Sequence, residues 1–238
     1  MTKVLGLIGS PVAHSLSPFI HNNFAALLGI DAVYTPFDVP LRPAALAAAL
    51  EGAHALGICG LNITYPHKTE AAKHAELDST AARVGAVNTL LRTGGGFAGY
   101  NTDIYGVKQA ILHHGFDISG GAVILGKGAA GHAAMCALQD MGCANTTMAG
   151  REAGYLEGSL LIAALPMDAD YSAHAANFDA VFDMNYTTGR PGGLAMLIYQ
   201  AAASFEIFTG HNVPQNIIDK IFVSLAEYQR PGRLFAHE

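Results

Sequence analysis

Short apolar runs rich in β-branched residues alternate with alanine-rich stretches over the first part of the chain. The run Val4 to Ile8 ends at Gly9-Ser10-Pro11, and a helix is expected to begin near Ser17 and Pro18, with Ser17 as its cap. The same unit is predicted twice more, with strands over 33–39 and 57–63 followed by helices over 44–50 and 67–75. Alternation of this kind is typical of parallel strands joined by crossover helices, so the sequence predicts an α/β fold.

A second region, in which a strand leads directly into a glycine-rich turn, begins at Ala122. Before it, a hairpin is predicted over 86–100, and Asp103 is expected to cap a helix that runs to about His114. From Ala122, a strand over 123–125 leads directly into a glycine-rich turn and a helix that ends near Met141. Further strands are predicted over 146–149, 160–163 and 180–182, with two closing helices over 194–208 and 214–228. The change at Ala122 predicts a second domain.

Composition and charge exclude several classes of protein. The chain has 238 residues, of which 51% are hydrophobic and only 13% charged, so a compact globular state is expected. Its formal net charge of −6 provides no basic field for a nucleic acid or an anionic membrane, and neither partner is expected. No apolar run approaches the roughly 20 residues of a membrane span, and the first residues do not form a signal peptide. We therefore expect a cytoplasmic protein.

Cysteine and histidine placement indicates neither a disulfide nor a metal site. The three cysteines, Cys59, Cys136 and Cys143, are an odd number in apolar segments, where buried thiols are expected. The 11 histidines show no metal-binding spacing. No metal is predicted.

The glycine-rich turn is the first candidate for chemistry. It has the spacing GxGxxG between a strand and a helix, which lets backbone approach a pyrophosphate at a helix N-terminus; its residues are Gly126, Lys127, Gly128, Ala129, Ala130 and Gly131. About 20 residues on, Arg151 is placed to pair with a ribose 2′-phosphate, which favours NADP. The adjacent Glu152 would repel that phosphate and accept from a free 2′-hydroxyl, which leaves NAD as the alternative.

Several polar residues elsewhere have two interpretations each. Lys68 lies in the first turn of a predicted helix, where a cation is disfavoured, so it is either a proton-transfer group or an ordinary surface lysine. Asp103 is by itself a routine helix cap, as is Ser17. Gln200 interrupts an almost wholly apolar helix, and its amide needs either a structural partner or a polar ligand. Ser15 and Ser17 place two hydroxyls after the first strand, where open α/β sheets bind ligands.

Five motifs in a fixed order extend the interpretation from single residues to a family. They are GSPVAHSLSPFIHN at 9–22, NITYPHK at 62–68, GAVNTL at 85–90, GYNTDIYG at 99–106 and GLAMLIYQAA at 193–202. Together they span most of the chain, which on this basis resembles the shikimate dehydrogenase family. The resemblance implies an oxidoreductase that interconverts 3-dehydroshikimate and shikimate with NADP(H), in the route to aromatic amino acids. It also implies a small-molecule partner, and we expect a monomer or a homodimer.

The resemblance assigns roles to single residues. It implies that Lys68 and Asp103 are the catalytic pair and that a set of hydroxyls, amides and one phenol surrounds the substrate: Ser15, Ser17, Thr64, Asn88, Tyr186 and Gln200. The family fold implies a substrate domain with a mixed sheet, built from residues 1–101 and 194–238. A shortened Rossmann-like domain over residues 102–193 is implied between these two parts.

The departures from the family pattern lie in the cofactor half. Lys127 replaces a small residue, and Gly150-Arg151-Glu152 retains only the arginine of the family's element for the 2′-phosphate. Too little chain separates Arg151 from the next strand for a helix, and six residues separate Tyr186 from Gly193 where the family has a longer connection. Alternative interpretations are a quinate or aminoshikimate dehydrogenase, or a shikimate-binding protein with impaired cofactor use. The acid–base pair favours the enzyme.

Overall fold

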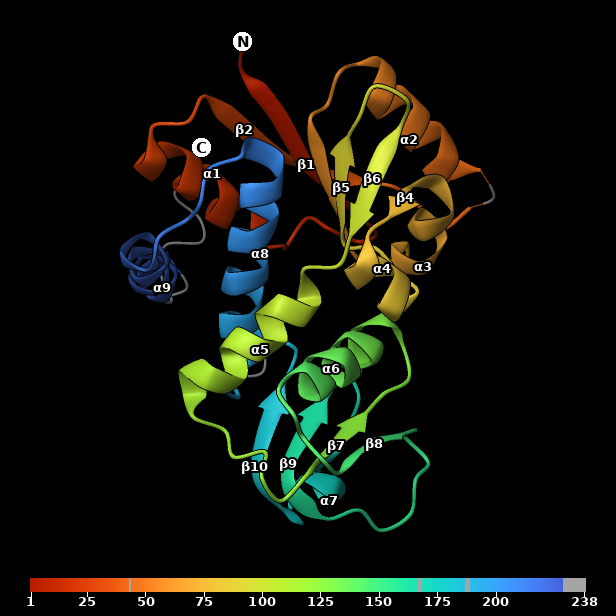
Figure 1. The fold of residues 1–238 in the computed structure, drawn as a ribbon, viewed down its shortest axis with the longest axis vertical. Coiled ribbons are helices and arrows are strands. Elements are labelled where there is room, and N and C mark those ends of the chain that lie inside the picture. The colour runs from red at the N-terminus through yellow and green to blue at the C-terminus, as the bar shows by residue number, and fades with distance from the viewer. Residues whose placement is uncertain (43, 167, 187–188, 229–238) are drawn as a thin grey trace.

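Two β-sheets follow one another along the chain (Figure 1). The structure is a computed structural model and describes residues 1–42, 44–166, 168–186 and 189–228. The first sheet contains β1 (Lys3–Gly9), β2 (Ala32–Asp38), β3 (Gly60–Ile63), β4 (Glu76–Leu77), β5 (Thr89–Arg92) and β6 (Phe97–Tyr100). The second contains β7 (Ala122–Leu125), β8 (Thr146–Ala149), β9 (Gly158–Ala163) and β10 (Phe178–Asp183). The predicted α/β class is confirmed, and the second sheet begins at Ala122, where the residue pattern of the sequence changes.

The first sheet is mixed, and its topology brings several loops to one edge. Its strand order is β2-β1-β3-β5-β6-β4. β5 runs antiparallel to β3 and β6, whereas β1 is parallel to both β2 and β3. The amino end of β5 therefore lies at the same sheet edge as the carboxyl ends of β1, β3 and β6. Open sheets commonly bind ligands at this edge.

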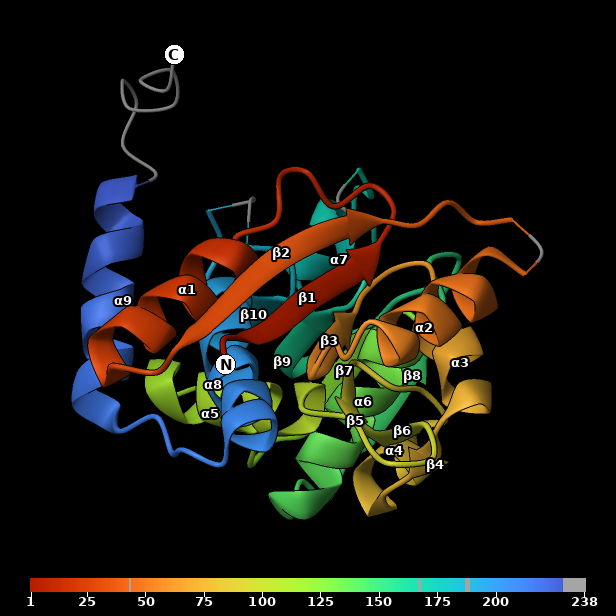
Figure 2. The same ribbon diagram turned by 90° about the horizontal axis from the view of Figure 1, so that it is seen from above.

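Helices cover both faces of the first sheet. On one face, Leu5 and Leu7 of β1 pack with Phe24 of α1 (Ser17–Leu28) and Phe205 of α8 (Gly193–Thr209). On the other face, apolar side chains of β1, β3 and β5 pack with α2 (Ala45–Ala55). Figure 2 shows α2 on one side of β1 and β3 and α1 with α8 on the other. The closing helix α9 (Gln215–Tyr228) packs beside α8 and α1.

The second sheet is parallel and covered unequally. Its order is β10-β9-β7-β8, with α5 (Asp103–His114) and α6 (Ala129–Asp140) packed against one face and α8 close by (Figure 1). On the opposite face, strand side chains pack with Ala175 of the one-turn helix α7 (Ser172–Ala175) and with loop side chains, which are Ala153, Leu156, Leu165 and Tyr171. Residues 150–157 contain no helix. The expected absence of a helix between Arg151 and the next strand is confirmed.

Local details differ from the sequence prediction at several points. The predicted helix over 67–75 is a short α3 (Lys68–Ala71) followed by the 3-10 turn η1 (Ala72–His74). The two-residue β4, the short α4 (Ser79–Val84) and α7 were not predicted, because elements this short leave no clear periodicity. Helix α2 extends to Ala55, beyond the predicted end at Leu50.

The two capping predictions are wrong. Ser17 is the first residue of α1 and Leu16 precedes it as the cap; it is the Ser15 hydroxyl that accepts from the Ser17 N–H, at 3.2 Å. Asp103 is likewise the first residue of α5, after Thr102, and its carboxylate caps no backbone N–H of the helix. The physical reason is that Asp103 is occupied by side chains from other elements, which the local capping rule does not consider.

Other expectations concern cysteines, metals and membranes. Cys136 is buried, whereas Cys59 and Cys143 are half-buried, and all three are free thiols. Within the described residues, no group of three His, Cys, Asp or Glu side chains is arranged to hold a metal ion. None of the described helices combines the length and apolar character required to cross a bilayer.

His21 of α1 is a buried, uncharged histidine in the core. Its ring stacks on Tyr34 with centroids 4.1 Å apart and planes 3° apart. Neither ring nitrogen has a hydrogen-bond partner among the described residues. Burial lowers the pKa of the His21 imidazole to about 3, from an ordinary value of 6.5. The folded chain therefore binds fewer protons here than the unfolded chain at mildly acidic pH.

We expect this histidine to make the fold acid-sensitive. Because the folded pKa lies below the unfolded one, the free energy of unfolding falls as the pH drops below 6.5. At pH 5 the loss attributable to His21 is about 2 kcal/mol, from about 1.4 kcal/mol per pH unit. Urea unfolding at pH 7 and pH 5 measures this loss for the wild type and for His21→Phe, which keeps an aromatic ring on Tyr34. An equal pH dependence in both proteins would contradict the assignment.

Candidate active site

Polar side chains converge on the edge where β1, β3 and β6 end and β5 begins. Ser15 and Ser17 follow β1, Thr64 follows β3, and Lys68 opens α3 immediately afterwards. Asn88 precedes β5 directly, and Asp103 opens α5 three residues after β6. Gln200 approaches from α8, which packs along α5. The topology therefore gathers residues from distant parts of the chain.

Lys68 and Asp103 form a close ion pair at the centre of this cluster. The Lys68 Nζ atom donates to Asp103 Oδ2 at 2.6 Å. The lysine side chain is 19% exposed and the aspartate side chain only 5%, so the ammonium group is the member of the pair nearer to solvent. The unfavourable position of a cation in the first turn of α3 is explained by this partner. An ammonium has three N–H donors, and only one is used by Asp103.

Asn88 and Gln200 complete the surroundings of the pair. The Asn88 amide nitrogen donates to Asp103 Oδ1 at 2.9 Å and approaches Gln200 Oε1 at 3.3 Å. Gln200 in turn donates to the Leu197 carbonyl oxygen at 3.0 Å. The buried amide of Gln200 thus has structural partners, one of the two interpretations left open by the sequence. Both carboxylate oxygens of Asp103 are engaged, Oδ1 by an amide and Oδ2 by an ammonium.

Ser15 and Ser17, which follow β1, each contact the hydroxyl of a tyrosine. The Ser15 side chain hydrogen-bonds the hydroxyl of Tyr186, which lies beyond the end of β10 in the second sheet region. Burial raises the pKa of the Tyr186 phenol, and the hydrogen bonds from Ser15 and the Leu16 backbone offset part of this rise. Ser17 hydrogen-bonds Tyr34 of β2. Tyr186 therefore connects the carboxyl edge of the second sheet to the loop after β1.

Thr64 lies at the same edge but outside this side-chain network. Its backbone N–H donates to the Ile8 carbonyl oxygen, and its methyl group lies against Gly9, where a Cβ would overlap it. Thr64 thus holds the ends of β1 and β3 together. The structure records no side-chain hydrogen bond from Thr64 to another described residue, and a role toward a ligand stays a prediction.

The glycine-rich turn has the geometry of a dinucleotide-binding loop. Gly126 follows β7 with φ of 124°, which favours glycine, and a Cβ at Gly131 would overlap the Gly126 carbonyl oxygen. Gly128 is the N-cap of α6, with no side-chain cap, and a Cβ placed there would meet nothing within 4 Å. Gly131 therefore serves the close packing of strand and helix, whereas Gly128 leaves open space in front of the helix N-terminus.

The residues beside this turn agree with the mixed cofactor signal of the sequence. Lys127, Arg151 and Glu152 are all exposed. The Glu152 carboxylate lies against Gly150, 2.5 Å from the position that a Cβ on that glycine would occupy. An acidic and a basic group therefore both lie just beyond the end of β8, where an adenosine ribose is bound in folds of this type.

Four members of the buried network were not identified from the sequence. These residues are Tyr34, Asn62, Thr89 and Thr102. The available signal was weak: Asn62 interrupts the apolar strand β3, and a buried amide of this kind needs partners. The partners themselves come from β2, β5 and the end of β6, so they become visible only once the strand order is known.

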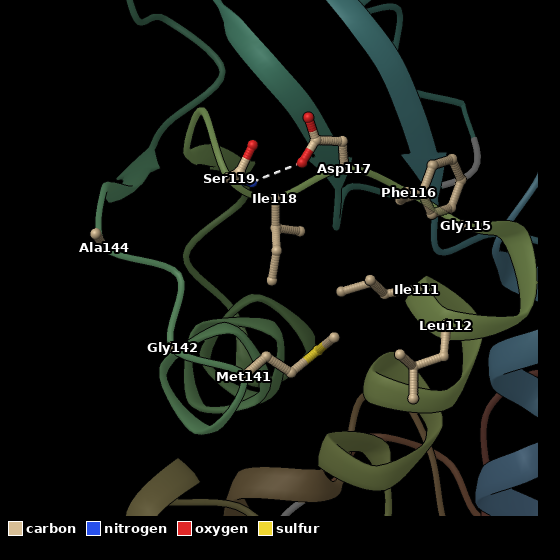
Figure 3. Close-up of a pocket in the computed structure, with 10 residues that line it drawn as sticks. All are labelled: Ile111, Leu112, Gly115, Phe116, Asp117, Ile118, Ser119, Met141, Gly142 and Ala144. Carbon is tan, nitrogen blue, oxygen red and sulfur yellow. Dashed lines mark hydrogen bonds between the residues drawn. The ribbon is translucent and has the colours of Figure 1, made fainter.

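A cavity of about 490 Å³ lies away from the ion pair, between the carboxyl ends of α5 and α6 (Figure 3). Apolar side chains such as Ile111, Leu112 and Met141 line it, and Asp117 at its border accepts from the Ser119 N–H at 2.8 Å. Ile111 and Leu112 belong to the last turn of α5, whereas Asp103 is its first residue. This cavity contains none of the candidate catalytic residues and is not the active site.

Two family models match parts of the chain that contribute residues to this site. A family model for the shikimate dehydrogenase substrate binding domain matches residues 7–90. A second model, for the shikimate 5′-dehydrogenase C-terminal domain, matches residues 193–220. The first match contains Lys68 and Asn88 and the second contains Gln200.

Relatives that match most of the chain have the same name, shikimate dehydrogenase (NADP(+)). A shikimate dehydrogenase (NADP(+)) of Halobacterium salinarum is 40% identical, covering 89% of this chain and 95% of the relative. One of Moorella thermoacetica is 35% identical, covering 92% of each. Among solved structures, shikimate dehydrogenase 1 of Peptoclostridium difficile matches with a TM-score of 0.83 at 26% identity, covering 95% of this chain and 99% of that one.

A further solved structure contains ligands. Shikimate 5-dehydrogenase of Thermus thermophilus, in complex with NADP(H) and shikimate, matches with a TM-score of 0.79 at 28% identity. The match covers 92% of this chain and 98% of that protein. The similarity therefore extends over both sheet regions.

Proposed function

The chain belongs to the shikimate dehydrogenase family, and from that premise we propose that it interconverts shikimate and 3-dehydroshikimate with NADP(H). The observation that carries this proposal is the contact of 2.6 Å between Lys68 and Asp103 at the ligand-binding edge of the first sheet. A protein that only binds shikimate has no evident need for an acid–base pair there. The relatives that match 89% and 92% of this chain are named shikimate dehydrogenase (NADP(+)).

The residues around the pair suit a polyhydroxylated ring. Asn88 and Gln200 present amide groups beside Asp103, whereas Ser15, Ser17 and Tyr186 present hydroxyls on the other loops. Such groups both donate and accept hydrogen bonds, as hydroxyls on a ring require. We assign these residues and Thr64 to substrate binding. The support is their convergence on one sheet edge and the match of their motifs to the family.

Lys68 and Asp103 handle the proton that accompanies hydride transfer. Oxidation of a hydroxyl to a carbonyl releases a proton, and the reverse reaction needs a proton at the developing alkoxide. Lys68 is the more exposed member and has donors left for the substrate oxygen. Asp103 is the more buried member, and it holds the Lys68 ammonium in place by charge and hydrogen bonding. In the reduction direction the Lys68 ammonium gives a proton to the alkoxide oxygen and becomes the neutral amine; in the oxidation direction the neutral amine takes the hydroxyl proton and becomes the ammonium again.

The fit of NADP rests on the turn after β7. The open space at Gly128 and the uncapped N-terminus of α6 suit a pyrophosphate, and we assign the binding to residues 126–131. When bound, NADP supplies the carbon that takes or gives the hydride. We assign Arg151 to the 2′-phosphate. Because Glu152 lies beside it, we also propose that NAD is accepted as a weaker alternative.

The domain boundaries, location and assembly of the protein also stay proposals. We assign residues 1–101 and 194–238 to the substrate domain and residues 102–193 to the cofactor domain, supported by the separate sheets over 3–100 and 122–183. Residues 43, 167, 187, 188 and 229–238 of these ranges lie outside the described residues. A cytoplasmic location and a monomeric or homodimeric state are predictions that the structure does not test.

Replacing Lys68 tests the catalytic assignment. We expect Lys68→Ala to lower kcat for shikimate oxidation by about two to four orders of magnitude, since a proton-transfer group is removed. The dissociation constant of shikimate, measured by calorimetry, should change much less. The matched control is Lys73→Ala, which removes an exposed lysine paired with Glu70 just after α3. A kcat that Lys68→Ala leaves within twofold of the wild type would refute the assignment.

Two glycine variants separate cofactor binding from folding. Gly128→Ala adds a Cβ to open space at a φ of −84°, so we expect an unchanged Tm but weaker NADP⁺ binding, because the methyl group occupies the path of the pyrophosphate. Gly131→Ala places its methyl group against the Gly126 carbonyl oxygen and should lower the Tm. Thermal unfolding and calorimetric titration distinguish the two effects. Wild-type NADP⁺ affinity in Gly128→Ala would place the cofactor elsewhere.

Arg151 should discriminate between the two cofactors. Arg151→Ala removes a charged partner for the 2′-phosphate, and we expect NADPH binding to weaken by roughly tenfold while NADH binding changes little. The matched control is Arg92→Ala, an exposed arginine on β5 that donates to the His54 carbonyl oxygen. Fluorescence titration with each cofactor gives the affinities. An equal loss for both cofactors would remove Arg151 from the 2′-phosphate site.

A further inference from the structure

A continuous chain of buried hydrogen bonds leads from β2 to the catalytic aspartate. The Tyr34 hydroxyl donates to Asn62 Oδ1 at 2.9 Å, and Asn62 Nδ2 donates to Thr89 Oγ1 at 3.1 Å. Thr89 Oγ1 donates to Asn88 Oδ1, and Asn88 Nδ2 donates to Asp103 Oδ1, both at 2.9 Å. All of these side chains are buried. Four hydrogen bonds therefore connect Tyr34 to Asp103.

Backbone groups fix the orientation of both amides in this chain. Asn62 Nδ2 also donates to the Asn88 carbonyl oxygen at 3.1 Å, and a carbonyl can only accept. The Asn62 oxygen must therefore face Tyr34. Asn88 Oδ1 accepts from the Thr102 backbone N–H at 2.8 Å, and an N–H can only donate. The Asn88 amide nitrogen must therefore face Asp103.

The hydroxyls of Tyr34 and Thr89 donate in the same direction along the chain. Tyr34 faces an acceptor oxygen and must donate to it, and burial raises the pKa of its phenol well above the ordinary value, so that its proton is retained. Thr89 Oγ1 accepts from Asn62 and donates to Asn88 Oδ1 at 2.9 Å, a shorter contact than its approach of 3.3 Å to Thr102 Oγ1. Every donor in the chain therefore points toward Asp103. Hydrogen bonds aligned in this way strengthen one another in a low-dielectric interior.

We propose that Tyr34, Asn62 and Thr89 are positioning residues that act together with the Thr102 backbone N–H to lock the Asn88 amide, so that it donates to Asp103. A reversed Asn88 would place its oxygen against the carboxylate and repel it. With Asn88 locked, Oδ1 is occupied by an amide and Oδ2 by Lys68, so the lysine is held in one position relative to the substrate. This role rests on the proposed function, because it presupposes that Lys68 and Asp103 are the proton-transfer pair.

The ring of Tyr34 is held by the stacked, uncharged His21, so its hydroxyl is held in register with Asn62. Ser17 also contacts Tyr34, so a change at Tyr34 affects a proposed substrate residue directly. Thr89 gives the cleaner test, because its described side-chain partners are Asn62, Asn88 and Thr102. It is fully buried, and valine matches its shape without the hydroxyl.

The experiment measures steady-state kinetics of shikimate oxidation for Thr89→Val, Thr89→Ser and Tyr34→Phe. We expect Thr89→Val to lower kcat roughly tenfold, with the KM for shikimate within about twofold, because a locking interaction and no substrate contact is lost. Thr89→Ser keeps the hydroxyl and should restore kcat. Thr209→Val is the matched control, since it removes a buried threonine hydroxyl that donates to the Phe205 carbonyl oxygen of α8.

A second readout does not depend on activity. We expect the side-chain amide protons of Asn88, followed by NMR, to exchange with solvent more slowly in the wild type and in Thr89→Ser than in Thr89→Val. If Thr89→Val does not fold, Tyr34→Phe tests the same chain from its other end and should show faster Asn88 exchange. Unchanged exchange and unchanged kcat in a folded variant would overturn the positioning role. A wild type that shows protected Asn88 but no turnover would instead overturn the proposed function and retain the locked amide.

Discussion

The contact between Lys68 and Asp103 is the constraint on which the rest of the site depends. Asp103 is a nearly buried carboxylate, and such a group is stable only with a counter-charge and further hydrogen bonds. Meeting that requirement fixes α3 against the first turn of α5. Because α5 packs on α8 and on α6, the same helix also connects the first sheet to the glycine-rich turn. The ion pair thus lies where the first sheet, α5 and the helices of the second sheet region are held together.

The two sheets differ in how completely helices cover their faces. The first sheet is covered by helices on both faces, and five ordered motifs lie on or beside it. The second sheet has four strands and lacks a helix over residues 150–157, so one face is covered by α7 and loop side chains. The glycine-rich turn that we propose to bind a pyrophosphate is nevertheless intact, because Gly131 packs closely on the Gly126 carbonyl oxygen. A dehydrogenase whose cofactor-binding region is shortened is consistent with both observations.

Much of the fold and the centre of the site could be predicted from the sequence, and the failures have a common cause. Apolar periodicity predicted most strands, and the motifs predicted Lys68, Asp103 and Asn88. Local rules assigned Ser17 and Asp103 as helix caps, because such rules do not consider a partner 35 residues away, as Lys68 is from Asp103. Tyr34, Asn62 and Thr89 were missed for the same reason: their hydrogen bonds depend on the order of β2, β3 and β5, which hydrophobic patterning does not determine.

The most direct test of a working, although shortened, dehydrogenase is the initial rate of reduced nicotinamide formation when the purified protein is mixed with shikimate and NADP⁺. The absorbance of the reduced cofactor gives the rate, and NAD⁺ is tested in parallel. The structure predicts saturable turnover with NADP⁺ and slower turnover with NAD⁺. Shikimate binding, established by calorimetry on the same sample, without turnover with either cofactor would contradict it and would indicate a binding protein that retains the pocket but not the reaction.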